Sequence, residues 1–205
     1  DSLSDDAKRM YARQMEVFAG FSENADWNVG RLLDDIEARG ELDNTLVIYI
    51  FGDNGASLEG TITGSFNEMT AVNGIKLTPE QQLSLIGEYG GLDAWGTDAF
   101  APHYAAAWAW AGNTPFHHTK LVASHFGGTR NPMVISWPKG IKPDRTPRAQ
   151  FSHVNDIVPT LYEVLGIKAP QVVDGFRQDP IDGTSPAYTF ADATAPTRKR
   201  VQYFD

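Results

Sequence analysis

The feature that most constrains the fold of this chain is a run of six apolar residues, 46–51, that directly follows a long amphipathic segment. The run is rich in β-branched and aromatic residues and has no polar face, which is typical of a strand buried on both sides in a parallel sheet. Before it, apolar residues recur with helical spacing from Tyr11 to Ile36, between a candidate N-cap at Ser4 and a stop at Gly40. A long helix followed at once by such a strand predicts an α/β fold.

Further elements are expected along the rest of the chain. Residues 78–81 have the pattern of a capping box with proline in the first turn, which predicts a short helix. Residues 133–137 predict a second strand, and residues 155–165 predict a further helix that ends at Gly166. Residues 56–114 show little periodicity and many aromatic side chains, so we expect an irregular, aromatic-rich insertion that is nevertheless packed.

Composition excludes several kinds of site from the chain. The 205 residues contain no cysteine, which excludes disulfides, zinc–thiolate sites, iron–sulfur clusters and a cysteine nucleophile. The formal net charge of −9 argues against a broad nucleic-acid-binding surface. No apolar run approaches the ~20 residues that span a bilayer. The cysteine count does not distinguish the bacterial cytoplasm from the periplasm, the two compartments considered, and no oligomeric state follows from the sequence.

Polar residues follow the first predicted strand: Asp53 and Asn54 stand between Gly52 and Gly55. Ligands of α/β folds bind beyond the carboxyl ends of the strands. Carboxylate and amide oxygens suit a hard cation such as Ca²⁺ or Mg²⁺, although calcium takes six to eight such ligands. An Asn-Gly turn that ends the strand explains the same residues and is the commoner local explanation.

A second polar group lies between residues 114 and 132. Its Lys120 can pair with an anionic substrate group as a compact point charge. His117 and His118 are adjacent, so on a regular element they point to different sides and form a poor metal pair. We interpret these two histidines and His103 as packed or surface residues, and we leave their role in a site open.

Taken in order, these segments resemble the arylsulfatase family, which belongs to the sulfatases of the alkaline phosphatase superfamily. Residues 42–55 contain the "DNT" turn, the strand and "GDNG"; residues 113–138 contain "NTPF", Lys120, "GGTRNP" and "ISWP". Residues 153–167 contain "DIVPT" and a following "LGI", and residues 181–185 read "IDGTS". Each match is short, but the ordered set extends over most of the chain.

The resemblance implies an alkaline-phosphatase-like α/β fold with a mixed, largely parallel sheet flanked by helices, of which residues 1–205 would form an incomplete part of a single catalytic domain. It also implies a sulfuric ester hydrolase, in which a formylglycine hydrate made from Cys or Ser attacks sulfur. A divalent cation, Ca²⁺ or alternatively Mg²⁺, would act as the Lewis acid. By position, Asp53 and Asn54 would be metal ligands, Asp53 would also contact the nucleophile, and Lys120 would bind a sulfate oxygen.

The chain also departs from the family pattern. The C/S-x-P-x-R motif that supplies formylglycine is absent, and the nearest pattern, residues 194–198, has Thr in the nucleophile position and is interpreted as a loop. The family's N-terminal acidic metal ligands, and a Lys and a His before the Asp-Asn pair, are absent too. We therefore expect an internal or proteolytic piece of a larger sulfatase that is inactive alone. Its partners would be the remainder of the parent chain and a small sulfate ester.

Two alternatives remain open at this point. One is a phosphate mono- or diester hydrolase of the alkaline phosphatase superfamily, although such enzymes usually bring additional Asp and His ligands for two zinc ions. A single Asp-Asn pair suits one hard cation better. The other alternative is a non-catalytic domain that retains the same fold.

Overall fold

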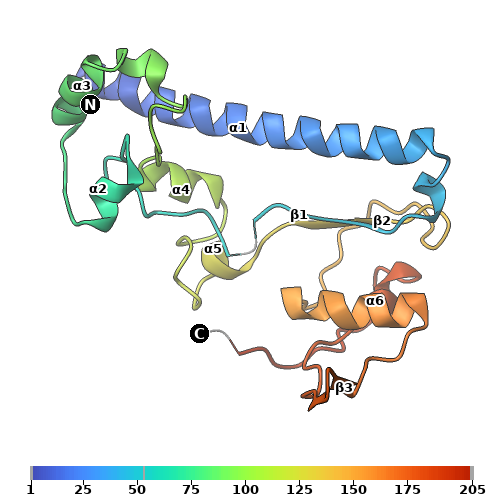
Figure 1. Ribbon diagram of the computed structural model, residues 1–205. Coiled ribbons are helices and arrows are strands. Elements are labelled where there is room, and N and C mark those ends of the chain that lie inside the picture. The colour runs from blue at the N-terminus through green and yellow to red at the C-terminus, as the bar shows by residue number, and fades with distance from the viewer. Residues whose placement is uncertain (1, 53, 204–205) are drawn as a thin grey trace. The chain divides into compact units, whose positions relative to one another are not determined.

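The computed structural model describes residues 2–52 and 54–203, and the backbone divides into two compact units. Unit 1 comprises Asp1–Arg39 and Tyr49–Val134, and unit 2 comprises Gly40–Ile48 and Ile135–Asp205. Figure 1 labels the main helices and strands of both units.

Helix α1 (Asp5–Ala38) is the long amphipathic helix that the sequence predicts. Ser4 is its N-cap, and the Ser4 hydroxyl accepts a hydrogen bond from the Ala7 N–H at 3.2 Å. The buried side chains of the helix are Ala7, Met10 and Gln14. The expected core-facing stripe is therefore only partly correct, since Leu32 is 60% exposed. Side-chain hydrogen bonds and an aromatic contact join the first half of α1, up to Phe18, to other described segments of unit 1.

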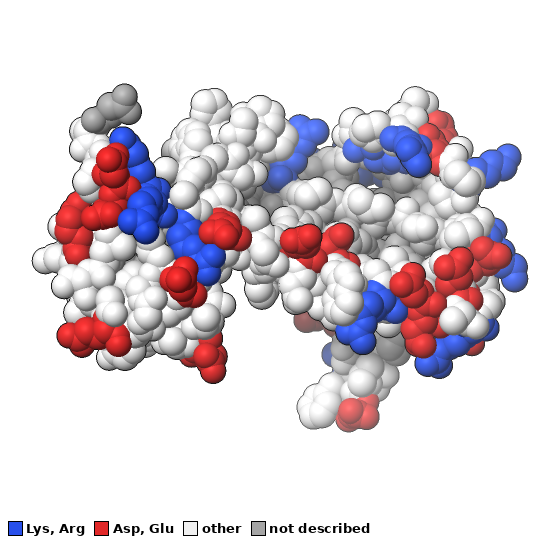
Figure 2. All heavy atoms as spheres, turned by 90° about the horizontal axis from the view of Figure 1, so that it is seen from above, with Lys and Arg blue, Asp and Glu red and all other residues white. Residues whose placement is uncertain are grey.

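Charged side chains along α1 form exposed pairs within the helix. Lys8 lies 3.4 Å from Asp5, and Arg39 lies 2.9 Å from Asp35. Figure 2 shows Lys and Arg side chains interspersed with Asp and Glu on the face seen from above. Such exposed pairs each add less than about 1 kcal/mol to stability, so packing and buried hydrogen bonds must supply most of the stability within each unit. A helix must be both long and apolar to cross a membrane. Helix α1 is long but too polar, and no other helix in the described ranges is long and apolar enough.

A small apolar core packs α1 against α3 (Pro79–Gly87). Its buried members, each at most 1% exposed, are Met10, Ile86 and Trp95. Helix α3 begins with the predicted capping box: the Thr78 side chain accepts from the Gln81 N–H, and the Gln81 side chain accepts from the Thr78 N–H. The helix predicted from these residues is confirmed.

Residues 56–114 contain more helix than the sequence predicts. Besides α3, the segment contains α2 (Glu68–Val72), the 3₁₀ turn η2 (Gly91–Ala94) and α4 (Ala106–Gly112). These three elements span one or two turns each, too few for a 3.6-residue period to become visible in the sequence.

Two buried glutamine amides fasten this segment to the helices of unit 1. Gln14 donates from Nε2 to the Thr63 carbonyl and accepts from the Ala105 N–H through Oε1, both at 2.9 Å. Gln82 does the same for the backbone of residues 64–66, with two hydrogen bonds of 3.0 Å. Each amide satisfies one N–H and one C=O that regular secondary structure leaves unpaired, which is what allows irregular backbone to be buried.

The two predicted strands are confirmed and pair with one another. β1 (Val47–Ile50) and β2 (Met133–Ser136) are hydrogen-bonded neighbours in a two-stranded sheet. The pairing is extended by the Phe51 N–H, which donates to the Pro132 carbonyl at 3.3 Å. The short helix α5 (Phe126–Thr129) precedes β2. Mixed helices and small sheets are compatible with an α/β fold.

In unit 2, the helix predicted over residues 155–165 is confirmed as a 3₁₀ turn, η3 (Val154–Asp156), that continues into α6 (Ile157–Leu165). Pro159 is accommodated in the first turn of α6, and Gly166 ends the helix with a left-handed φ of 64°. The remaining elements are η1 (Leu42–Asn44), η4 (Ala187–Phe190) and an antiparallel hairpin of β3 (Val172–Val173) and β4 (Phe176–Arg177). The hairpin was not predicted.

Unit 2 contains a buried ion pair between Lys199 and Asp156. Lys199 Nζ donates to Asp156 Oδ1 at 2.8 Å, and the two side chains are 4% and 2% exposed. Asp156 also accepts from the Thr184 N–H at 2.7 Å and from the His153 N–H at 2.8 Å. The "DIVPT" and "IDGTS" motifs therefore meet at one carboxylate, which accepts three hydrogen bonds.

Replacement of this carboxylate should strongly destabilise unit 2. Asp156→Ala leaves the Lys199 ammonium buried without its counter-charge, which we expect to cost about 3–5 kcal/mol. Hydrogen exchange of the peptides covering α6, followed by mass spectrometry, measures the loss of protection. The matched control Asp35→Ala removes an exposed ion pair and should change stability by less than about 1 kcal/mol. Equal protection in the two variants would contradict the central role of Asp156.

Candidate active site

The predicted metal ligands follow β1. Asp53 lies outside the described residues, so its assigned roles as metal ligand and catalytic group stay predictions. Asn54 is exposed to solvent. The next residue, Gly55, has a left-handed φ of 84°, and its N–H donates to Asn131 Oδ1 at 2.9 Å. The loop after β1 is thus anchored to the chain segment that leads into β2.

Asn113 joins the loop after β1 to the loop that carries Lys120. Its Oδ1 accepts from the Ala56 N–H at 3.1 Å, and its Nδ2 donates to the His118 carbonyl at 2.9 Å. The Lys120 N–H donates directly to the Ala56 carbonyl at 3.0 Å. The loop that begins with the predicted ligands and the loop of the predicted sulfate-binding lysine are therefore neighbours in space.

Close backbone packing around Gly127 completes this arrangement. The Gly127 N–H donates to the His117 carbonyl at 2.9 Å. A Cβ at Gly127 would overlap the carbonyl oxygens of His117 and His118, and a Cβ at Gly55 would overlap the Gly127 carbonyl. Glycine is required at both positions because backbone approaches backbone there.

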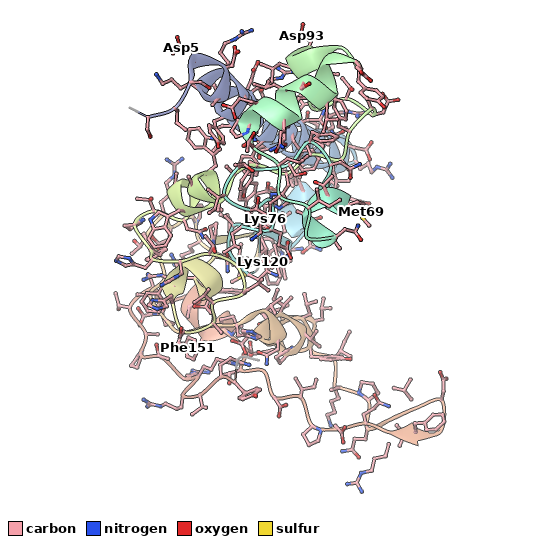
Figure 3. The ribbon with its side chains drawn as sticks, turned by 90° about the vertical axis from the view of Figure 1, so that its left-hand side faces the viewer. Asp5, Met69, Lys76, Asp93, Lys120 and Phe151 are labelled. Carbon is pink, nitrogen blue, oxygen red and sulfur yellow. The ribbon has the colours of Figure 1, made fainter. Side chains whose placement is uncertain are left out.

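Lys120 forms an ion pair in the structure. Its Nζ donates to Glu59 Oε2 at 2.9 Å, and the side chains are 28% and 51% exposed. The Ser57 hydroxyl donates to the same Glu59 oxygen at 2.7 Å. These hydrogen bonds, from Ser57 first and Lys120 second, lower the pKa of Glu59, so the carboxylate is charged at neutral pH. Figure 3 labels Lys120 among the side chains of unit 1.

His103 extends this network by one residue. His103 Nε2 lies 3.0 Å from Ser57 Oγ, and His103 Nδ1 lies 3.1 Å from the Tyr104 carbonyl oxygen. Ser57 Oγ thus contacts both the Glu59 carboxylate and the His103 ring.

The other histidines of this region pack on aromatic neighbours. The Trp110 ring lies 6.0 Å from the His117 ring and 5.5 Å from the His118 ring, centroid to centroid. The His118 and His125 rings are 4.1 Å apart. His117 and His118 thus form part of an aromatic cluster, in keeping with their interpretation as packed or surface residues.

Backbone strain also gathers beside Lys120. His118 has a φ of 65° and Leu121 has a φ of 76°, both in the left-handed region. For residues with a Cβ this conformation costs about 1–2 kcal/mol each. Strained residues persist when surrounding contacts impose the conformation, and they gather at functional sites. Here the hydrogen bonds of Asn113 and Ala56 supply such contacts.

The described residues do not by themselves form a metal centre. Within residues 2–52 and 54–203, no group of three or more His, Cys, Asp or Glu side chains lies close enough together to hold a metal ion. Asn54 is thus the one predicted ligand that the described ranges contain. No chemical step through a metal is derived from these residues.

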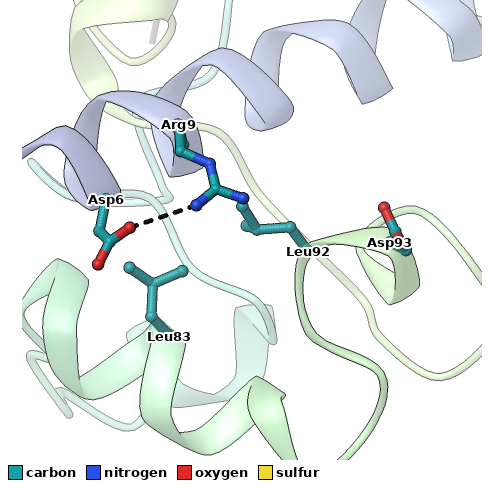
Figure 4. Close-up of a pocket in the computed structure, with 5 residues that line it drawn as sticks. All are labelled: Asp6, Arg9, Leu83, Leu92 and Asp93. Carbon is teal, nitrogen blue, oxygen red and sulfur yellow. Dashed lines mark hydrogen bonds and ion pairs between the residues drawn. The ribbon is translucent and has the colours of Figure 1, made fainter.

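An open pocket of about 270 Å³ lies elsewhere in unit 1. Figure 4 shows its lining residues, which are Asp6, Arg9, Leu83, Leu92 and Asp93. The Arg9 guanidinium lies 3.4 Å from Asp6, so the cation in this pocket is already paired with a carboxylate. The pocket includes none of the predicted site residues.

Comparison with known proteins identifies the family. The sulfatase family model matches residues 2–167, and the chain belongs to the sulfatase family. The resemblance found in the motifs is therefore confirmed, and membership implies an alkaline-phosphatase-like α/β fold.

Individual relatives agree with this assignment. The chain is 34% identical over 170 residues to an uncharacterized sulfatase of Schizosaccharomyces pombe. The aligned region covers 83% of this chain and 28% of the relative. It is 29% identical over 168 residues to an arylsulfatase of Klebsiella aerogenes, and this aligned region covers 82% of this chain and 32% of the relative. An ulvan-active sulfatase of Formosa agariphila is 44% identical over 48 residues, 23% of this chain and 9% of that protein. The chain spans less than a third of the length of these relatives.

The sequence did not reveal two residues that organise these loops. Asn113 and Glu59 were not assigned a role, although Asn113 begins one of the family-like segments. Both residues act through partners that are distant in the sequence, so periodicity and local motifs give no signal for them. The one available hint was the position of Asn113 in a segment shared with sulfatases.

Removal of the Asn113 amide should loosen the two loops. Asn113→Ala leaves the Ala56 N–H and the His118 carbonyl without their partner, which we expect to cost about 1–3 kcal/mol. Hydrogen exchange at residues 56 and 118–120 should accelerate in this variant. Asn73→Ala is the matched control, because Asn73 makes an exposed hydrogen bond within its own turn, to Met69. Unchanged exchange in Asn113→Ala would show that the amide does not hold the loops together.

Proposed function

We propose that this chain forms part of the active site of a sulfuric ester hydrolase of the arylsulfatase type. Residues 1–205 would belong to a single catalytic domain with an alkaline-phosphatase-like, largely parallel sheet, in which residues 56–114 are an aromatic-rich insertion. The observation that carries the proposal is the attachment of the Lys120 loop to the loop after β1 through Asn113. It brings together the segments that would bind the cation and the sulfate group.

In this proposal Lys120 binds a sulfate oxygen. One N–H of its ammonium group donates to Glu59, and an ammonium group has three such donors. A cation aimed at the sulfate group stabilises the negative charge that develops when the ester bond breaks. The partial exposure of the side chain, 28%, allows a ligand to reach it.

A divalent cation is typical of sulfatases, and we propose that Asp53 and Asn54 supply two of its oxygen ligands. Ca²⁺ is the expected ion, with Mg²⁺ as the alternative, because both prefer oxygen ligands. When bound, the ion would polarise the sulfate group as a Lewis acid. The remaining ligands and the formylglycine nucleophile would come from outside these residues, so the chain alone would be inactive.

The reaction class is tested with the full-length protein on an aryl sulfate and the matching aryl phosphate. We expect hydrolysis of the sulfate ester to dominate, because a single cation with oxygen ligands suits the proposed site better than two zinc ions. Cleavage of the phosphate alone would replace the proposal with a phosphatase of the same superfamily. Cleavage of neither substrate, with the cation bound, would favour a non-catalytic domain.

Removal of the Lys120 ammonium should impair turnover. We expect Lys120→Ala to lower kcat by on the order of 10²-fold or more, as for the loss of a charge-stabilising group. Steady-state kinetics on the aryl sulfate measure the effect, and Lys76→Ala, at an exposed lysine of the same unit, serves as control. Near-normal turnover of Lys120→Ala would remove Lys120 from the site.

Replacement of Asp53 should cost both metal and activity. Asp53→Ala removes a charged oxygen ligand, so the purified variant should contain less of the divalent cation per chain. Elemental analysis of the purified protein gives this stoichiometry directly. Asp98→Ala, at an exposed carboxylate, should leave the metal content unchanged. A full complement of metal in Asp53→Ala would refute its role as a ligand.

A further inference from the structure

We propose that Glu59 is a positioning residue for Lys120, and that Ser57 and His103 hold Glu59 in place for this task. The proposal rests on the proposed function, because it assigns Lys120 to the sulfate group. It assigns roles to Ser57 and Glu59, which no motif singles out, and to His103, whose role the sequence leaves open; all three lie between β1 and α4. Nothing in the described motifs requires these three side chains.

The first argument is the freedom of a lysine side chain. Lysine ends in a flexible four-carbon chain with about 2 kcal/mol of rotamer entropy, so an unrestrained Lys120 would bind an anion in many arrangements. The 2.9 Å hydrogen bond to Glu59 Oε2 restricts where Nζ lies. Among the described residues, Glu59 is the side chain that pairs with Lys120 Nζ. The remaining N–H groups of the ammonium are thereby directed away from Glu59.

The second argument is that Glu59 is itself restrained. The Ser57 hydroxyl donates to Glu59 Oε2 at 2.7 Å, and the Glu59 N–H donates to Ser57 Oγ at 3.3 Å. His103 Nε2 reaches Ser57 Oγ at 3.0 Å from a separate segment, which an antiparallel bridge pairs with Ser65. Glu59 is therefore bound at both its side chain and its backbone, which makes it a firm partner for a flexible lysine.

The third argument is that stability does not explain this network. Glu59 is 51% exposed and Lys120 is 28% exposed. Ion pairs of this kind contribute little to folding, because water screens the charges and two long side chains lose freedom. A half-exposed pair that is nonetheless fixed by a serine and a histidine is better suited to present one group, the ammonium, to a ligand.

A double-mutant cycle on the full-length protein tests the proposal. We expect Glu59→Ala to lower kcat/KM on an aryl sulfate by about tenfold to a hundredfold, mainly through kcat, as for a misplaced catalytic group. Because Glu59 would act through Lys120, the double variant with Lys120→Ala should be no slower than Lys120→Ala alone. Glu59→Gln, which keeps an acceptor oxygen, should lie between Glu59→Ala and the unaltered protein. Glu23→Ala, on an exposed face of α1, should have no effect.

The outcomes separate the two proposals. The positioning role would be overturned if the losses in kcat/KM of the two single variants multiplied in the double variant. It would also be overturned if Glu59→Ala kept normal activity while Lys120→Ala was impaired. Either result would leave the proposed function intact. A fully active Lys120→Ala would instead refute the role of Lys120 itself.

A second measurement needs no turnover. Limited acetylation, read by mass spectrometry, compares the reactivity of Lys120 with that of the exposed Lys76 in one sample. Loss of the Glu59 partner should increase acetylation of Lys120 by about twofold to fivefold, the range that a weak ion pair supports, and leave Lys76 unchanged. Ser57→Ala should produce a smaller increase in the same direction. Circular dichroism confirms that the variants are folded, and an unchanged Lys120 rate in folded Glu59→Ala would contradict the proposal.

Discussion

The rest of this structure depends on hydrogen bonds that a few side-chain amides and one carboxylate make to the backbone. Much of the chain is irregular, and irregular backbone can be packed only when its N–H and C=O groups find partners. Gln14 of α1 and Gln82 of α3 each bond one N–H and one C=O of irregular backbone in unit 1. Asn113 does this for the two loops of the candidate site, and Asp156 ties the motifs of unit 2 together.

The same constraint explains where the candidate site lies. The Lys120 loop is built from neither helix nor strand, and it includes two residues in the left-handed region, His118 and Leu121. Such a loop keeps one conformation because Asn113 and the Ala56 backbone bond to it from a distant part of the chain. The energy of these contacts compensates for the strain, and a lysine is thereby presented at a defined place beside the loop that follows β1.

The elements of the fold were predictable wherever they depend on local chemistry. Helical spacing and the Ser4 cap identified α1, the capping box identified α3, and apolar runs identified β1 and β2. Periodicity could not show that Leu32 would be exposed, since burial depends on what packs against a helix and not on the helix itself. In the candidate site, the role proposed for Lys120 comes from the family resemblance, whereas the role proposed for Glu59 depends on contacts that only the folded chain creates.

Two lysine–carboxylate pairs show how environment separates a structural pair from the pair proposed to serve the candidate site. Lys199 and Asp156 are 4% and 2% exposed, and the carboxylate has further backbone donors, so neither group can leave the other without a large desolvation cost. Lys120 and Glu59 meet at nearly the same distance, 2.9 Å against 2.8 Å, but they lie at the surface. The energy that holds Lys120 to Glu59 is small enough for an anion to share or replace it. A carboxylate can therefore fix the position of an ammonium group and still let that group bind an anion when the pair is partly exposed, as at Lys120 and Glu59, but not when it is buried.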